Sequence, residues 1–218
     1  MRVFVTGATG FIGSAIVREL LGAGHRVLGL SRSDAGAGAL AGAGADVHRG
    51  SLEDLDSLKR GAAAADGVIH TAFIHDFSDF AANAKTDQVA IDAMAEELAG
   101  SGKPFIVSSG ILGLPPVRTG TEDDVPTSIL PRKSETSGLA AAARGVRAMA
   151  IRLAPSVHGD GDHGFVPALI VRTSAGLRIL RGRGVEPLAR GAPGGRSQAL
   201  PACAGDRARV VQGGKCLI

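Results

Sequence analysis

The sequence predicts an α/β fold in which helices cover both faces of a doubly wound parallel sheet. Five strand and helix units follow one another along the first two thirds of the chain, and this alternation is typical of parallel sheets. A glycine-rich turn separates the first strand from the first helix. With 218 residues, the chain is long enough for one domain, or for one domain and a fragment of another.

The first thirteen residues, MRVFVTGATGFIG, form a strand, a turn and the start of a helix. The run Arg2–Thr6 is β-branched and aromatic, and it stops at glycine before Phe11 opens a helix-periodic segment. Gly7, Gly10 and Gly13 suit a tight turn, the approach of backbone to a ligand, and close packing of helix on strand. A diphosphate at this helix start would meet free N–H groups and the positive end of the helix dipole.

The string TGATGFIG closely resembles the N-terminal motif of the extended and atypical short-chain dehydrogenase/reductases, the family of nucleotide-sugar epimerases and dehydratases. The resemblance implies a Rossmann fold that binds NAD or NADP. It places cofactor contacts on Gly7, Thr9, Gly10, Phe11, Ile12 and Gly13. The alternative interpretation is a plain strand-to-helix turn that merely needs glycine.

The second strand, Arg26–Leu30, runs into Ser31, Arg32 and Ser33. Dinucleotide-binding folds place the group that contacts the adenine ribose at this point. An acidic residue there favours NAD, whereas Arg32 suits the 2′-phosphate of NADP. We therefore expect Ser31 and Arg32 to contact the cofactor and NADP to be preferred over NAD. The alternative for Arg32 is a solvated arginine at a strand end.

The segment Ala35–Ala45 is almost entirely Ala, Gly and Leu, so its helix should be short or frayed. Ala45–Gly50 is predicted to be the third strand. Ser51 should then cap a helix whose first turn is acidic. The resembled family usually has an Asp at this position, where it touches adenine, which implies cofactor contacts for Ser51 and Leu52. Capping alone is the alternative for Ser51.

Gly67–Ala72 is predicted to be the fourth strand and resembles the family's V-I-H-x-A motif beside the cofactor ribose. Thr71 and Ala72 therefore inherit a cofactor-lining role. His70 either packs its ring in the core or acts as a base.

A long amphipathic helix is predicted over Asp79–Leu98, and the fifth strand over Pro104–Ser109, with Ser108 among the cofactor contacts. The sixth strand, Arg147–Leu153, leads to Pro155, in a segment that resembles the one that meets the nicotinamide.

The tyrosine that serves the resembled family as proton donor is missing, because the chain contains no Tyr. In that family a Ser or Thr follows the fifth strand, a position that aligns here with Gly110, and a Tyr-x-x-x-Lys pair lies on the next helix. The matching segment, Pro131–Glu135, has Glu135 where the lysine would be. It is similar to the R-x-x-S-E of an atypical branch. That branch also shows the TEDD found at Thr121–Asp124 and the PSVHGxGDHGF found at Pro155–Phe165.

The catalytic residues are therefore unknown from sequence, with weak candidates at Ser109, Glu135, His158 and His163. The two histidines lie near Asp160 and Asp162, and these side chains suit zinc or iron. A polar turn explains the same cluster. Because no motif with fixed ligand spacing is present, we predict no metal site.

Charge is unevenly distributed. Residues 173–218 contain seven Arg and one Lys against Glu186 and Asp206, a balance of +6, which leaves −3 for residues 1–172 out of a total of +3. Without aromatic interleaving or a nucleic-acid motif, this basic tail does not indicate nucleic-acid binding. Cys203 and Cys216 make neither a disulfide framework nor a metal pattern. No apolar stretch suits a signal peptide or a membrane span, so we expect a cytoplasmic protein that does not bind membranes.

After Arg172 the helix and strand periodicity is lost, and the genetic code offers an explanation. Glu186–Pro193 can be encoded as GAA CCG CTG GCC CGC GGT GCA CCG, which gives NRWPAVHR when read one base later. Continued through Arg196, the shifted string NRWPAVHRVDA closely resembles the family's next motif. We infer a frameshift between about Phe165 and Gly184.

The sequence thus predicts an NAD(P)-binding Rossmann domain over residues 1–172 and, over residues 173–218, an irregular, frameshifted remnant of the substrate-binding region. The expected function is that of an NAD(P)-dependent oxidoreductase or epimerase/dehydratase-like protein acting on a small carbonyl or hydroxyl substrate. A non-catalytic dinucleotide-binding or redox-sensing module is the alternative, favoured by the missing Tyr and Lys.

Overall fold

The computed structural model describes residues 1–114, 120–126, 130–154, 157–159, 161, 162, 164, 167, 170, 171, 209–212 and 215–217. The chain divides into two compact units, Met1–Ala154 with Ala208–Ile218, and Pro155–Arg207. The sequence suggests a domain boundary at Arg172, whereas the first unit breaks off at Ala154. The first unit also includes the last residues of the tail, from Ala208.

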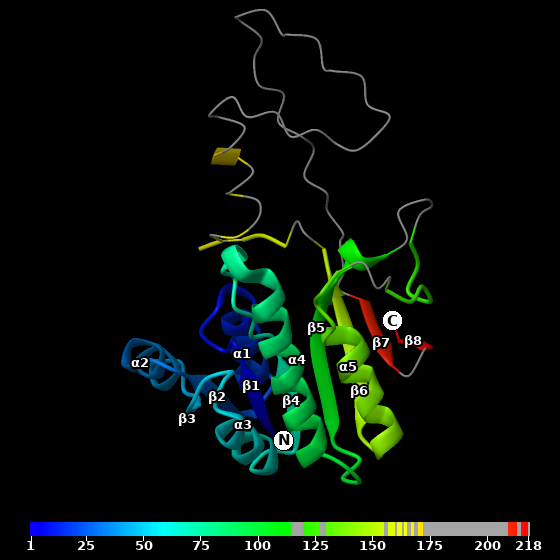
Figure 1. Ribbon diagram of the computed structural model, residues 1–218. Coiled ribbons are helices and arrows are strands. Elements are labelled where there is room, and N and C mark those ends of the chain that lie inside the picture. Colours follow the sequence, from blue (N-terminus) through cyan, green and yellow to red (C-terminus); the bar gives the residue numbers. More distant parts are fainter. Residues whose placement is uncertain are drawn as a thin grey trace, which may run out of the picture. The chain divides into compact units, whose positions relative to one another are not determined.

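Six parallel strands form the body of the first unit (Figure 1). They are β1 (Arg2–Thr6), β2 (Arg26–Ser31), β3 (Asp46–Arg49), β4 (Gly67–His70), β5 (Pro104–Gly110) and β6 (Arg147–Leu153). Their spatial order, β3-β2-β1-β4-β5-β6, is that of a doubly wound dinucleotide-binding sheet. The predicted fold class is therefore confirmed. The order reverses direction between β1 and β4, and ligands of such sheets bind at the carboxyl ends of the strands at this point.

Five α-helices connect these strands. They are α1 (Phe11–Gly22), α2 (Asp34–Gly42), α3 (Leu55–Ala63), α4 (Phe80–Glu97) and α5 (Ser134–Ala140), accompanied by the short 3₁₀ helices η1 (Phe77–Asp79), η2 (Ile111–Gly113) and η3 (Ala141–Arg144). Val17 of α1 and Leu40 of α2 pack with Val5 on one face of the sheet. Leu58 of α3 and Ile91 of α4 belong to the larger cluster on the other face.

One helix start differs from expectation. The helix expected at Ser51 begins at Leu55, and its cap is Asp54, whose carboxylate accepts a hydrogen bond from the backbone N–H of Ser57 at 2.9 Å. The prediction of Ser51 as that cap was wrong, because both residues can cap a helix and spacing alone did not separate them. The glycine-rich α2 is short, as the sequence predicts, with nine residues, and the hydroxyl of Ser33 caps its start.

Two short antiparallel strands extend the sheet beyond β6. They are β7 (Arg209–Gln212), which pairs with β6, and β8 (Lys215–Leu217), which pairs with β7. They add regular structure to a tail for which the sequence predicts none. The edge of a sheet accepts such a strand because its backbone groups are otherwise unpaired.

Candidate functional site

The glycine turn lies where β1 ends at the switch point of the sheet. Gly7 has a φ of +67°, which disfavours other residues, and a Cβ there would lie 2.7 Å from the backbone nitrogen of Ala72. A Cβ on Gly13 would lie 2.0 Å from the carbonyl oxygen of Gly7. The structure thus shows the tight turn and the close helix packing that the sequence predicts. The same contacts bring Gly7, Thr71 and Ala72 together, as expected.

The start of α1 differs from the starts of the next three helices. The side chains of Ser33, Asp54 and Asp79 accept hydrogen bonds from backbone N–H groups in the first turns of α2, α3 and α4, respectively. Gly10 provides no such cap for α1. Gly10 and Thr9 are exposed. The first N–H groups of a helix have no partner within the helix, and α1 has no acidic residue in its first turn. This helix start is therefore suited to an anion.

Two arginines and one acid lie at the neighbouring ends of β2 and β3. Arg32 is exposed and has no hydrogen bond or ion pair with any residue that the structure describes. Asp34 forms an ion pair with Arg49. Ser31 is buried, and its hydroxyl donates to the carbonyl oxygen of Ser33 at 3.0 Å. Of the two predicted cofactor contacts here, Arg32 is thus available to a ligand, whereas the Ser31 hydroxyl stabilises the turn after β2.

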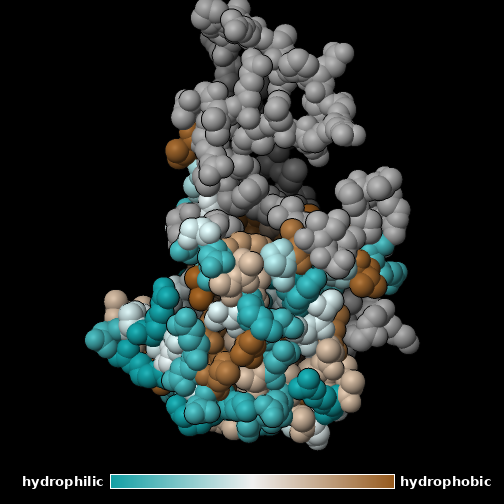
Figure 2. Space-filling view, viewed as in Figure 1, coloured by the Kyte–Doolittle hydropathy of each residue, from teal (hydrophilic) through white to brown (hydrophobic). Residues whose placement is uncertain are grey.

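A hollow of about 200 Å³ lies beside the end of β3, lined by Leu52 and Leu55 and, from α4, by Lys85, Thr86 and Val89. Figure 2 shows apolar patches among the polar residues over α3 and α4. Ser51 is half-buried, and its hydroxyl accepts a hydrogen bond from the backbone N–H of Glu53 at 3.2 Å. Of the predicted pair, Leu52 therefore lines an apolar recess, whereas the hydroxyl of the adjacent Ser51 is engaged locally.

A chain of buried side chains crosses the α3–α5 face, behind the glycine turn. Thr6 Oγ1 lies 2.8 Å from His70 Nδ1, and His70 Nε2 lies 3.1 Å from Asp87 Oδ1. Ser134 donates to the second oxygen, Asp87 Oδ2, at 2.5 Å. Thr6, His70 and Asp87 are fully buried. His70 therefore packs within the core, one of its two predicted alternatives, and both Asp87 oxygens are occupied.

Arg132 joins this chain at the carboxyl edge of the sheet. Its Nε donates to Ser134 Oγ at 2.7 Å, its Nη2 donates to the carbonyl oxygen of Ser108 at 3.2 Å, and its guanidinium lies 4.2 Å from the centre of the Phe73 ring. Burial lowers the pKa of Arg132, and the Asp87 carboxylate partly opposes this shift. The side chain keeps 27% of its surface exposed. Asp87 and Arg132 were not among the predicted site residues.

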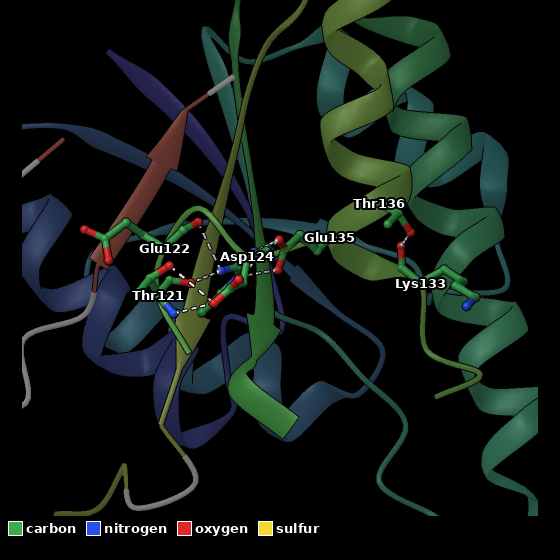
Figure 3. Close-up of polar contacts among 7 residues, drawn as sticks. Thr121, Glu122, Asp124, Lys133, Glu135 and Thr136 are labelled. Carbon is green, nitrogen blue, oxygen red and sulfur yellow. Dashed lines mark hydrogen bonds and ion pairs between the residues drawn. The ribbon is translucent and has the colours of Figure 1, made fainter. Parts of the chain in front are cut away.

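Glu135, a weak catalytic candidate, is buried in an ion pair. Arg152 donates to both of its carboxylate oxygens, with Nη2 at 2.6 Å from Oε1 and Nε at 3.0 Å from Oε2. The same guanidinium donates to the backbone oxygens of Thr121, Glu122 and Asp124, so this loop lies against Glu135 (Figure 3). The hydrogen bond to Glu135 raises the pKa of Arg152. Whether Glu135 also acts in catalysis stays a prediction.

The other predicted site residues differ in burial, and two of them lie outside the described residues. Ser108 is buried at the end of β5, and Ser109 is half-buried beside it. His158 is exposed in the second unit. Pro155 and His163 lie outside the described residues. Across the described ranges, no three His, Cys, Asp or Glu side chains come together in a metal-binding group. No helix in those ranges is long and apolar enough to cross a membrane.

A family model matches the part of the chain that carries the glycine turn and the first five strands. It is that of the NAD dependent epimerase/dehydratase family, and it matches residues 3–109. Residues 3–109 are therefore similar to this family. The resemblance that the sequence motifs suggested is thus confirmed.

Two fungal proteins are similar to this chain over most of its length. An uncharacterized protein of Schizosaccharomyces pombe is 50% identical over 189 residues, and one of Saccharomyces cerevisiae is 44% identical over 190 residues. The matches cover 85% and 84% of this chain and 64% of each relative. The chain therefore spans less than two thirds of the length of either relative.

A similar solved structure is that of the Bordetella bronchiseptica enzyme WbmG in complex with NAD and UDP. It has a TM-score of 0.66 and 25% sequence identity, over 82% of this chain and 61% of the enzyme. The fold that carries the glycine turn is therefore shared with proteins of known structure.

Proposed function

We propose that this chain binds a nicotinamide dinucleotide at the turn from Gly7 to Gly13 and belongs to an NAD(P)-dependent oxidoreductase or epimerase/dehydratase-like enzyme acting on a small carbonyl or hydroxyl substrate. The observation that carries the proposal is the uncapped, exposed start of α1 at the switch point of the sheet. The match of residues 3–109 to the family model and the NAD bound to the similar WbmG enzyme support it. The cofactor would supply the hydride chemistry that such enzymes use.

The residues present fit such a cofactor. The diphosphate would lie on the free N–H groups of Phe11, Ile12 and Gly13, with Gly10 leaving room for it. Thr71 and Ala72 lie against Gly7 at the neighbouring strand end, where the ribose would be. Of the other proposed contacts, Thr9, Ser31, Arg32, Ser51, Leu52 and Ser108 lie at or just after the ends of β1, β2, β3 and β5.

Gly10→Val tests the site directly. A branched side chain at Gly10 would occupy the space of the diphosphate, so we expect the affinity for NADH and NADPH to fall at least about tenfold while the fold persists. Because the chain has neither Trp nor Tyr, titration by the fluorescence of the reduced cofactor has no overlapping protein signal. Gly22→Val places the same side chain at the other end of α1, in open space, and should bind as the wild type does. Equal affinity of all three proteins would show that the turn is structural only.

We further propose that NADP is preferred through Arg32. Arg32 is exposed, and the nearby Asp34 is paired with Arg49, which reduces its repulsion of a 2′-phosphate. Charge-assisted hydrogen bonds contribute about 1.5–3 kcal/mol, so Arg32→Ala should weaken NADP binding about ten- to a hundredfold and leave NAD binding nearly unchanged. Arg26→Ala, at the opposite end of the same strand, is the control. An unchanged ratio of the two affinities would contradict the preference.

A non-catalytic dinucleotide-binding module is the second candidate. The observation in its favour is the buried Glu135–Arg152 pair, because it stands where the resembled enzymes have the lysine of their Tyr–Lys pair. A screen of small carbonyl compounds for oxidation of NADPH separates the two candidates. Turnover supports the enzyme, and binding without turnover of any compound supports the module.

A further inference from the structure

Arg132 and Arg152 both contact α5 or its first residues, but their guanidinium groups differ in how many acceptors they contact. Arg152 is bound by both oxygens of Glu135 and by three backbone carbonyl groups. Within the described residues, Arg132 has only a long ion pair, in which Asp87 Oδ2 lies 4.0 Å from its Nε. Ser134 donates to that same oxygen and accepts from Arg132, so it stands between the two charges.

The guanidinium of Arg132 therefore keeps unused hydrogen-bond donors. Of its three nitrogens, Nε and Nη2 donate to Ser134 and Ser108, while Nη1 has no acceptor among the residues that the structure describes. The Phe73 ring and the carbonyl of Ser108 fix the plane of the group. A guanidinium that is immobilised, largely desolvated and incompletely paired binds oxyanions well, because little entropy is lost on binding.

The position of Arg132 places this cation beside the proposed cofactor site. Ser108 lies in the last part of β5, and Phe73 follows directly on Thr71 and Ala72 at the end of β4. Both strands end at the same edge of the sheet as the glycine turn, because β1, β4 and β5 are parallel neighbours. A substrate that meets the cofactor at this edge would come within reach of the guanidinium.

We propose that Arg132 is a substrate-binding residue and that the substrate carries an oxyanion, a carboxylate or a phosphate. This inference rests on the proposed function, since it names the substrate class of the same site. Asp87 and Ser134 are positioning residues that act through Arg132.

The test uses malonate and inorganic phosphate as separate probes, titrated by calorimetry into the full chain saturated with NAD, so that the cofactor occupies the glycine turn. We expect the wild type to bind at least one probe and Arg132→Gln to bind it at least about tenfold more weakly. Arg60→Gln, which changes an exposed arginine of α3, should match the wild type. A stronger response to malonate indicates a carboxylate substrate, and one to phosphate a phosphorylated substrate.

Absence of binding by the wild type, or equal binding by Arg132→Gln, overturns the inference. If Arg132→Gln does not fold, Arg132→Lys decides, because it keeps the charge and loses the planar fork. Affinity equal to that of the wild type would then overturn the inference. Cofactor titration of the same samples separates the two proposals. If the chain binds the anion through Arg132 but binds no NADH, only the proposed function is contradicted. Gly10→Val is then the control, because unchanged anion binding by this variant shows that the anion does not bind at the glycine turn.

Discussion

The two faces of the sheet differ in how far burial extends across it. On the α3–α5 face, the row Phe4, Val68, Phe105 and Ala148 is buried from β1 to β6. One residue further along each strand, the row Val5, Ile69, Ile106 and Met149 faces the α1–α2 side, where Val5 is buried and the other three are only half-buried. Burial on this second face therefore decreases beyond β1.

Within the described residues, helices therefore bury the whole width of the sheet on the α3–α5 face, but not on the α1–α2 face. The α3–α5 face holds the larger apolar cluster and the buried chain from Thr6 to Arg132. The α1–α2 face holds a smaller cluster and a hollow of about 250 Å³ between the two helices, lined by Val17, Leu40 and others. The larger apolar cluster and the side chains that hold Arg132 thus lie on the same face.

Restoring the inferred reading frame tests this comparison most directly. If an in-frame segment covers Ile106 and Met149, each side chain that becomes fully buried adds about 1 kcal/mol or more. The thermal midpoint of the in-frame chain should therefore exceed that of the present chain by several degrees, or about 4–8 °C for each kcal/mol in a domain of 100 residues and less in a larger one. Equal midpoints would contradict the frameshift proposal.

Two neighbouring residues of β5 test the two faces in the present chain. Phe105→Ala removes a fully buried ring and should lower the free energy of unfolding by about 3–5 kcal/mol. Ile106→Ala removes a half-buried side chain and should cost only about 1–2 kcal/mol. Urea denaturation measures both. Equal costs would show that the second face is as well packed as the first, and in the in-frame chain the cost of Ile106→Ala should rise.

Two helical glycines give a smaller effect of opposite sign. A Cβ at Gly38 of α2 meets nothing within 4 Å, so Gly38→Ala should stabilise by about 0.5–1 kcal/mol. A Cβ at Gly61 of α3 would lie 2.4 Å from the Phe4 ring, so Gly61→Ala should destabilise by about 1–3 kcal/mol. Thermal unfolding of both variants is the measurement, and stabilisation by both changes would contradict the tight packing of α3.

The smallest effect is expected from the exposed pair of Lys59 on α3 and Glu96 on α4, which are 2.8 Å apart. Lys59 lowers the pKa of Glu96 below its ordinary value of 4.5, so the stabilisation is present above this value and is lost as the pH falls through the folded value. Glu96→Gln should therefore lower stability slightly at neutral pH and have no effect at about pH 2. A difference that persists in acid, or in high salt, would contradict the ionic origin.

Local pattern predicted most of the fold, since β1 and β6 have the bounds that the sequence suggests. The candidate site was less predictable because its side chains come together only in three dimensions. Asp87 looks like one polar residue of an amphipathic helix, yet it is fully buried against His70 and Ser134. Likewise, Arg152 lies within a strand, and its pairing with Glu135 follows no sequence spacing.

The antiparallel pairing of β7 with β6 has a consequence for self-association. An unpaired seven-residue strand at the edge of a sheet offers its backbone groups to another chain, whereas short edge strands discourage such addition. In this chain β7 covers part of β6, and the outermost strand is β8, which has three residues. A chain cut before Ala208 would leave the whole edge of β6 to solvent. Its solubility at high concentration would then decline before its folding did.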